Sequence, residues 1–122
     1  MKALKLASTL ATPYAVIGLS ATAGKLKIES GAITVNEKAL LDILKNLGAT
    51  GKSNEIIKVP YSNPQTIYFT GLGETSKSYD PENLRRAAGS AARELAGQST
   101  ATFALPASTL AQISAVAEGA AL

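Results

Sequence analysis

A glycine-rich segment at residues 48–53, GATGKS, is similar to the end of a phosphate-binding loop. In such a loop, backbone N–H groups and a lysine surround the phosphates of a nucleotide, and a helix begins directly after the lysine. The motif also requires a glycine five positions before Gly51, where this sequence has Asn46. Apolar spacing places a helix before this loop and a strand after it, so no helix N-terminus faces a phosphate. These departures argue against a nucleoside triphosphate site.

A second glycine pattern, GLGETS at residues 71–76, follows an apolar strand, as in a dinucleotide-binding turn. Ser76 replaces the third glycine of that motif, Glu74 would bring a carboxylate near the phosphates, and the next helix starts only at Pro81. Gly71 and Gly73 could instead let the chain leave a crowded strand end. Because ligands of open α/β sheets bind at the carboxyl ends of strands, a small-ligand pocket stays open as an alternative here.

Side chains suited to acid–base catalysis or metal ligation are scarce. The sequence has no histidine and no cysteine, which removes the commonest general base near neutral pH and any thiolate ligand. Glu74, Asp80 and Glu82 lie near one another, but Asp80 and Glu82 are explained by helix capping. No residue is therefore assigned a catalytic, cofactor-binding or metal-binding role, and this chain alone is not expected to be an enzyme.

Positive charge slightly exceeds negative charge. Twelve lysines and arginines against nine acidic residues give a net charge of +3, and the densest group is Arg85, Arg86 and Arg93 within one predicted helix. A nucleic-acid-binding surface normally combines a basic stripe with aromatic residues for stacking. The scattered charges favour a solvated helix surface over nucleic-acid binding.

The N-terminal residues have some features of a signal peptide. Lys2 and Lys5 precede a mostly apolar stretch, and residues 21–23 imitate a cleavage site. Pro13 and several hydroxyl residues interrupt this stretch, and its longest apolar run, residues 15–19, is shorter than the ~7–15 residues of a signal sequence. No run approaches the ~18 apolar residues of a membrane span. The sequence predicts a cytoplasmic protein.

Length and composition predict one α/β domain. The 122 residues are 46% apolar and 17% charged, which is typical of a folded domain of ordinary size. Apolar spacing and turn residues predict strands at residues 3–6, 14–19, 25–29, 55–59, 66–70 and 100–105, with an extended piece at 33–35. Turns are predicted at 60–64 and after 70. The alternation of strands and helices in the second half indicates a layered sheet.

Three helices are predicted from capping signals and apolar spacing. The first is capped by Asn36 and ended by Gly48, and the second is capped by Asp80, with Pro81 in its first turn, and ended by Gly97. The third begins near residue 108. The apolar positions of the first helix are Leu40, Leu41, Ile43, Leu44 and Leu47. The second is expected to bury Leu84, Ala87, Ala88, Ala91, Ala92 and Leu95. The third is expected to bury Leu110, Ile113, Val116, Ala117 and Ala120, with Gly119 as a weak point.

Several segments in the second half together carry a family resemblance. They are IYFTGLG at residues 67–73, NLRRAAG at 83–89 within the helix after Asp80, TGK at 50–52 followed by the strand ending at Pro60, and AVAEGA at 115–120. In this order they resemble the N-terminal domain of the leucyl aminopeptidases, also called cytosol aminopeptidases, of peptidase family M17. The resemblance covers most of residues 45–122.

The resemblance implies a macro-domain-like α/β/α fold with three layers around a mixed sheet. It also implies a parent enzyme whose separate C-terminal domain binds two divalent metals, zinc or manganese, and removes N-terminal amino acids from peptides. The family's metal ligands are lysine, aspartate and glutamate residues of that second domain, and none of those motifs occurs here. Residues 1–122 are therefore expected to be the N-terminal accessory domain, separated from its catalytic domain and located at the periphery of a homohexamer.

Three functional hypotheses follow from the sequence. The first is a non-catalytic domain with a structural, assembly or access-restricting role, whose partners are its own catalytic domain and neighbouring subunits. The second is a module that binds a nucleotide-like ligand such as ADP-ribose, suggested by the macro-like fold alone. The third is a nucleic-acid-binding domain, against which the modest charge argues.

Overall fold

The strand β2 (Tyr14–Thr22) is the centre of the sheet in the computed structural model, which describes residues 3–5, 14–30, 36–62, 65–95, 100–107 and 109–120. Along one side, β2 pairs in parallel with β5 (Gln65–Glu74). Along its other side it pairs first in parallel with β6 (Thr100–Ala104) and then antiparallel with β3 (Lys25–Glu29). Because β2 has strand neighbours on both sides, its backbone groups are satisfied within the sheet.

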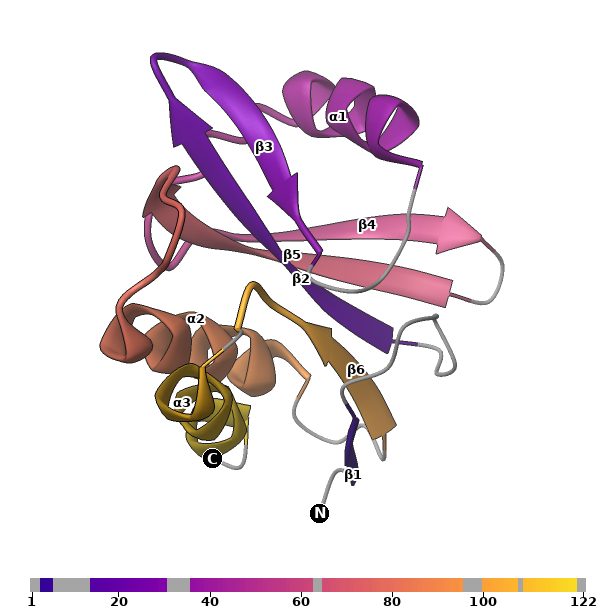
Figure 1. The fold of residues 1–122 in the computed structure, drawn as a ribbon. Coiled ribbons are helices and arrows are strands. Elements are labelled where there is room, and N and C mark those ends of the chain that lie inside the picture. Colours follow the sequence, from indigo (N-terminus) through magenta and orange to yellow (C-terminus); the bar gives the residue numbers. More distant parts are fainter. Residues whose placement is uncertain are drawn as a thin grey trace.

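The two outer strands complete a mixed sheet of six strands within the described residues (Figure 1). β1 (Ala3–Lys5) pairs in parallel with β6, and β4 (Ile56–Ser62) pairs antiparallel with β5, which gives the order β1-β6-β2-β5-β4. Three helices accompany the sheet: α1 (Glu37–Asn46), α2 (Pro81–Glu94) and α3 (Leu110–Ala120). The prediction of a single α/β domain with a mixed sheet is confirmed.

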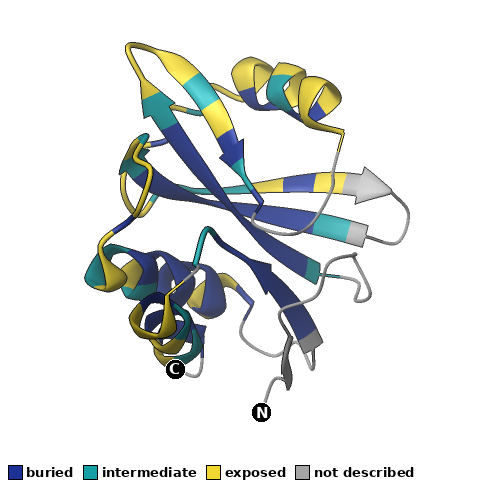
Figure 2. Cartoon of the chain, in the orientation of Figure 1, coloured by how far each residue is buried: buried dark blue, intermediate teal, exposed yellow. Residues whose placement is uncertain are grey.

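Side chains of β2 alternate between two hydrophobic clusters. Ile17 and Leu19 pack with Leu40 of α1, whereas Val16 packs in the cluster that contains the buried side of α2. This is the period-two alternation of a strand, and here both faces are covered. Figures 1 and 2 show α1 on one side of the sheet, α2 and α3 on the other, and a buried β2 between them.

Helix α1 begins and ends where its capping residues predict. The side chain of Asn36 accepts a hydrogen bond from the backbone N–H of Ala39 at 3.2 Å, and Gly48 follows the helix with φ +77°. Only Leu40 and Leu44 are fully buried along this helix, whereas Ile43 and Leu47 are 39% and 56% exposed. The predicted apolar face was therefore too wide, because only a narrow stripe of α1, at Leu40 and Leu44, is fully buried against the sheet.

Helix α2 confirms the capping prediction at Asp80. The Asp80 carboxylate accepts a hydrogen bond from the backbone N–H of Glu82 at 2.9 Å, and Pro81 occupies the first helical position. The helix ends at Glu94, and Leu95 forms its C-cap; the predicted stop at Gly97 lies outside the described residues. All six residues of the predicted buried face are buried: Leu84, Ala87, Ala88, Ala91, Ala92 and Leu95.

The predicted face of α3 was wrong in part. Leu110 is 81% exposed, and Ile113 and Ala117 are only half-buried, whereas Val116 and Ala120 are buried as expected. The buried residues of this helix are Gln112, Ala115, Val116, Gly119 and Ala120. The reason is that α3 packs mainly against α2 rather than on the sheet, and close contact between two helices selects small residues.

Three strands are longer than predicted, and the first of them, β2, continues past its predicted end at residue 19 to Thr22. β5 continues through the predicted turn after residue 70 as far as Glu74, which pairs with Ala21, and a register irregularity opposite Leu19 and Ser20 accommodates the additional residue. β4 runs through Pro60 to Ser62, where a turn was expected; edge strands tolerate a proline because one side of their backbone is unpaired. The bounds of β3 agree with the prediction, and residues 33–35 lie outside the described ranges.

No helix within these described ranges is long and apolar enough to cross a membrane.

Candidate functional site

The two glycine motifs of the sequence contact each other at the carboxyl end of β5. The backbone N–H of Gly73 donates to the carbonyl of Gly51 at 2.9 Å, and the N–H of Gly71 donates to the carbonyl of Glu55 at 2.7 Å. A Cβ atom at Gly71 would lie 1.8 Å from the carbonyl oxygen of Lys52, so only glycine permits this approach. The glycines therefore bind the loop at residues 49–55 to the strand, and both N–H groups are engaged.

Glu55 occupies the hydrogen-bond donors of the segment that is similar to a phosphate-binding loop. Its carboxylate accepts the backbone N–H groups of Gly51 at 2.7 Å and of Thr50 at 3.0 Å, and it also accepts the Thr50 hydroxyl at 3.0 Å. Successive backbone N–H groups in such a turn can bind an anion. Here the Glu55 carboxylate of the same chain occupies the position of that anion. The strand β4 follows this loop at Ile56, as predicted. The role of Glu55 was not predicted, and the available signal was a glutamate four residues after Gly51.

A polar network lies at the carboxyl-terminal half of β2 and was not predicted. The Tyr79 hydroxyl donates to Glu29 Oε2 at 2.7 Å, and the Ser20 hydroxyl donates to the same oxygen at 3.1 Å. The Ser20 and Thr75 hydroxyl oxygens are 2.9 Å apart, and the Lys27 ammonium lies 3.9 Å from Glu29 Oε2. The network connects β2 and β3 with the segment between β5 and α2.

Burial of the Tyr79 ring raises the pKa of its hydroxyl, and the hydrogen bond and negative charge of Glu29 raise this pKa further. The hydrogen bond with the Ser20 side chain, which is the second-largest effect, and that with the Ser76 backbone lower the same pKa, but the net direction is upward. A phenol whose pKa is raised stays protonated at neutral pH and does not act as a general base. The arrangement therefore fits a structural connection between strands.

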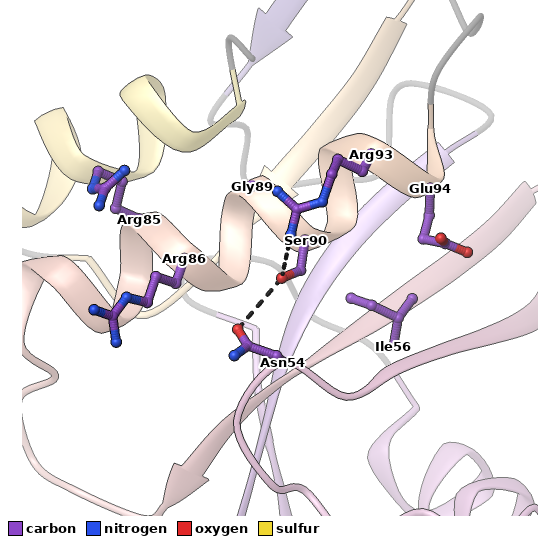
Figure 3. A pocket seen from close by; sticks show the side chains of 8 residues that line it. All are labelled: Asn54, Ile56, Arg85, Arg86, Gly89, Ser90, Arg93 and Glu94. Carbon is purple, nitrogen blue, oxygen red and sulfur yellow. Dashed lines mark hydrogen bonds between the residues drawn. The ribbon is translucent and has the colours of Figure 1, made fainter.

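The third region is a cleft between α2 and the segment that enters β4, called the α2 cleft below (Figure 3). Its larger part has a volume of about 440 Å³. This part is lined by Asn54 and by the three arginines that form the densest cationic group of the sequence, Arg85, Arg86 and Arg93. The structure thus brings the densest cationic group of the sequence to one hollow surface.

Two of these arginines have an acidic partner on the same helix. Glu82 forms ion pairs with Arg85 and with Arg86, the latter at 3.0 Å. The hydrogen bond and charge of Arg85 lower the pKa of the Glu82 carboxyl, and Glu82 in turn raises the pKa of Arg85. Arg93 instead donates to the Ser90 hydroxyl at 3.2 Å.

Comparison with known proteins identifies the family. The profile of the cytosol aminopeptidase family, N-terminal domain, matches residues 16–122. The chain belongs to this family. A protein of Streptomyces coelicolor named "Probable cytosol aminopeptidase" is 41% identical over 113 residues, which are 85% of this chain and 22% of that protein. Proteins with the same name from Streptomyces griseus and Rhodococcus erythropolis are 38% and 32% identical, over 95% and 98% of this chain and 24% of each relative. The chain thus spans less than a quarter of these relatives.

Four acidic residues of this cytosol aminopeptidase domain are engaged in contacts that do not fit a divalent metal pair. Glu29, Glu55 and Glu82 bind hydroxyl groups, backbone N–H groups and arginines, respectively, and Asp80 caps α2. Within the part of the chain that the structure describes, no three histidine, cysteine, aspartate or glutamate residues form a group that could hold a metal ion.

Proposed function

We propose that this chain is the non-catalytic N-terminal domain of a longer cytosol aminopeptidase, with a structural, assembly or access-restricting role. One observation carries the proposal: the N-terminal-domain profile matches residues 16–122, while the same chain covers only 22% to 24% of relatives named for the aminopeptidase activity. The hydrolytic chemistry then belongs to the remaining length of such an enzyme.

Further properties of the parent enzyme belong to the same proposal. Its catalytic domain holds two divalent metals, zinc or manganese, and the enzyme is a cytoplasmic homohexamer in which this domain contacts its own catalytic domain and neighbouring subunits. The domain has a macro-like fold with three layers. The position of α1 on one side of the sheet and of α2 on the other supports the layered description.

The hydrogen bonds that polar side chains form within the domain support a non-catalytic role. Catalytic acids, bases and nucleophiles must reach a substrate with an available proton or lone pair. Here the Glu55 carboxylate binds its own loop, and the Glu29 carboxylate binds Ser20 and Tyr79. Among the described residues, no buried side-chain nitrogen or oxygen lacks a hydrogen-bond partner. Such internal hydrogen bonds stabilise the fold, as expected of a domain with a structural role.

Deletion of this domain from the full-length enzyme tests the proposal. We expect the truncated, metal-loaded enzyme to hydrolyse leucine p-nitroanilide with kcat reduced by no more than about tenfold, since the chemistry lies elsewhere. We also expect a change in subunit assembly by light scattering, or in the ratio of kcat/KM between a long peptide and a dipeptide.

Two controls make the deletion experiment decisive. Circular dichroism and metal content establish that the truncated enzyme is folded and loaded. In the full-length enzyme, Glu55→Gln and Glu29→Gln should leave kcat for leucine p-nitroanilide within about twofold. Loss of this turnover in a folded truncated enzyme, or in either variant, contradicts a non-catalytic role.

A further inference from the structure

The larger part of the α2 cleft has the size and wall composition of a small-ligand site. Its volume of about 440 Å³ falls within the roughly 300–1,000 Å³ of typical ligand pockets. Gly89 contributes no side chain to the wall, and the half-buried Ile56 provides an apolar surface. A ligand would therefore meet a polar side and an apolar side.

The donors of this part exceed its acceptors. The Ser90 hydroxyl accepts from Arg93 at 3.2 Å and donates to Asn54 Oδ1 at 3.4 Å, so its one proton and the amide oxygen are both engaged (Figure 3). The Asn54 side-chain NH₂ and the remaining guanidinium N–H groups of Arg93 are then donors available to a ligand beside Ser90, in a part that Glu94 also lines. Such a donor set selects a ligand rich in acceptor oxygens.

The side chain of Arg93 is directed into the cleft. Arginines in the last turn of a helix commonly interact with the terminal carbonyl groups and the helix dipole. Arg93 instead extends back along α2 to Ser90, one turn earlier (Figure 3). Among the described residues, no carboxylate lies within ion-pair distance of Arg93, so its planar fork is available to an external oxyanion.

The net charge around the larger part fits a monoanion. Three arginines and Glu94 line it, which gives 3 − 1 = +2, and the Glu82 carboxylate bound to Arg85 and Arg86 reduces this to +1. Asp80 and Glu82 line the adjoining smaller part at the start of α2, and Glu94 lines the larger part at the end of the helix, so carboxylates lie toward both ends of the cleft. Arg93 follows Glu82 by eleven positions, which corresponds to about 16 Å along a helix. A polyanion along the whole cleft would approach these carboxylates.

We infer that the α2 cleft binds an organic monocarboxylate with a short apolar chain, whose carboxylate lies on Arg93 and Asn54 and whose apolar part lies against Ile56. The carboxylate could be the end of a peptide or amino acid, or the side chain of a glutamate; both present the same planar pair of oxygens. Arginine binds this group through two parallel N–H···O bonds.

Nuclear magnetic resonance of the ¹⁵N-labelled chain tests this inference with N-acetyl-L-leucine as the probe. We expect saturable shifts of the Asn54 side-chain NH₂ and the Arg93 Nε–H resonances. N-acetyl-L-leucinamide, which has the same apolar chain and no charge, should not shift them. N-acetyl-L-glutamic acid α-amide, whose only carboxylate is on its side chain, distinguishes the two sources: the tighter binder identifies the natural one, and both outcomes support a carboxylate site.

Variants of the same chain show whether the cleft itself binds the probe. Arg93→Gln should weaken N-acetyl-L-leucine binding by about tenfold or more, since a charge-assisted hydrogen-bond pair is lost. Arg93→Lys, which keeps the charge and removes the fork, should also weaken it, and spectra of both variants show whether they are folded. Lys45→Gln, which removes an exposed charge on α1, should change the affinity by less than about twofold. Equal shifts with the amide, unchanged affinity in Arg93→Gln, or tighter binding of inorganic phosphate than of either carboxylate would overturn the inference.

Discussion

Gly119 of α3 lies so close to Arg85 of α2 that a Cβ atom at Gly119 would be 2.2 Å from the Arg85 carbonyl oxygen. The same added atom would lie 3.0 Å from the Cβ of Ala88 and from the backbone nitrogen of Gly89. Gly119 is therefore the residue that lets the two helices approach, and it is not the weak point that helix propensity alone predicts. The α2–α3 contact depends on the absence of a side chain at this position.

Gly119→Ala should destabilise the domain. Alanine favours a helix over glycine by about 1 kcal/mol, but overpacking against a backbone atom costs about 1–3 kcal/mol, and at this contact overpacking should prevail. We expect a net loss of up to about 2 kcal/mol in the free energy of unfolding, measured with urea. Ser114→Ala, on the exposed side of the same helix, is the control and should stay within about 0.5 kcal/mol. A stabilising Gly119→Ala would show that the helices are not in this contact.

Asp80→Ala should lower the free energy of unfolding by about 1 kcal/mol, because the hydrogen bond from the Glu82 backbone N–H is lost. Asp80→Asn is the matched control, since asparagine caps helices about as well as aspartate. Urea denaturation of the three proteins measures the difference. If alanine and asparagine have the same effect, the stabilisation does not come from the cap.

Tyr79 should make the domain less stable at alkaline pH. Its pKa is raised in the folded state above the ordinary value of 10.0, so the unfolded chain loses this proton first as the pH rises. The contribution of Tyr79 to stability is complete below about pH 10 and falls as the pH rises from there through the higher folded pKa.

Tyr79→Phe isolates this contribution. The variant should be about 1–2 kcal/mol less stable than the parent at pH 8, because the hydrogen bond to Glu29 is lost. The difference between the two proteins should shrink as the pH rises above about 10, and absorbance at 295 nm should show a late-titrating phenol in the parent only. A difference that is constant over this range would mean that Tyr79 titrates equally in both states.

Local interactions explain which features the sequence predicted. The caps at Asn36 and Asp80 involve residues two or three positions apart, so their residue types suffice to place the helix starts. The buried face of α2 was also predictable, because this helix packs directly on the sheet, where apolar spacing alone selects the face.

Contacts between distant segments explain what the sequence could not predict. The face of α3 depends on α2, whose surface is not visible in the spacing of α3 itself. Tyr79 and Glu29 are 50 positions apart, and no local pattern signals their hydrogen bond. The role of Gly71 depends on Lys52, which a loop brings against β5. A turn was predicted at the glycine motif of residues 71–76. The structure instead continues β5 to Glu74, because this segment pairs with β2, which is distant in the sequence.

Nucleoside triphosphates and ADP-ribose should not bind this chain. The donors at Thr50 and Gly51 are occupied by the Glu55 carboxylate, and a phosphate approaching them would be repelled by this charge. The N–H groups of Gly71 and Gly73 are also engaged. Calorimetric titration with ATP and with ADP-ribose should give only heats of dilution. Micromolar affinity for either ligand would make a nucleotide-binding module the better explanation of the domain.

The most direct test of a non-catalytic domain is a hydrolysis assay on this chain alone. We expect no hydrolysis by the chain alone, because the sequence has no histidine and no cysteine, and four of its nine acidic side chains, Glu29, Glu55, Asp80 and Glu82, make internal contacts. The purified chain, incubated with leucine p-nitroanilide and either zinc or manganese, should release p-nitroaniline at the rate of the sample without protein. Metal-dependent release that co-elutes with the chain in size-exclusion chromatography would contradict the account.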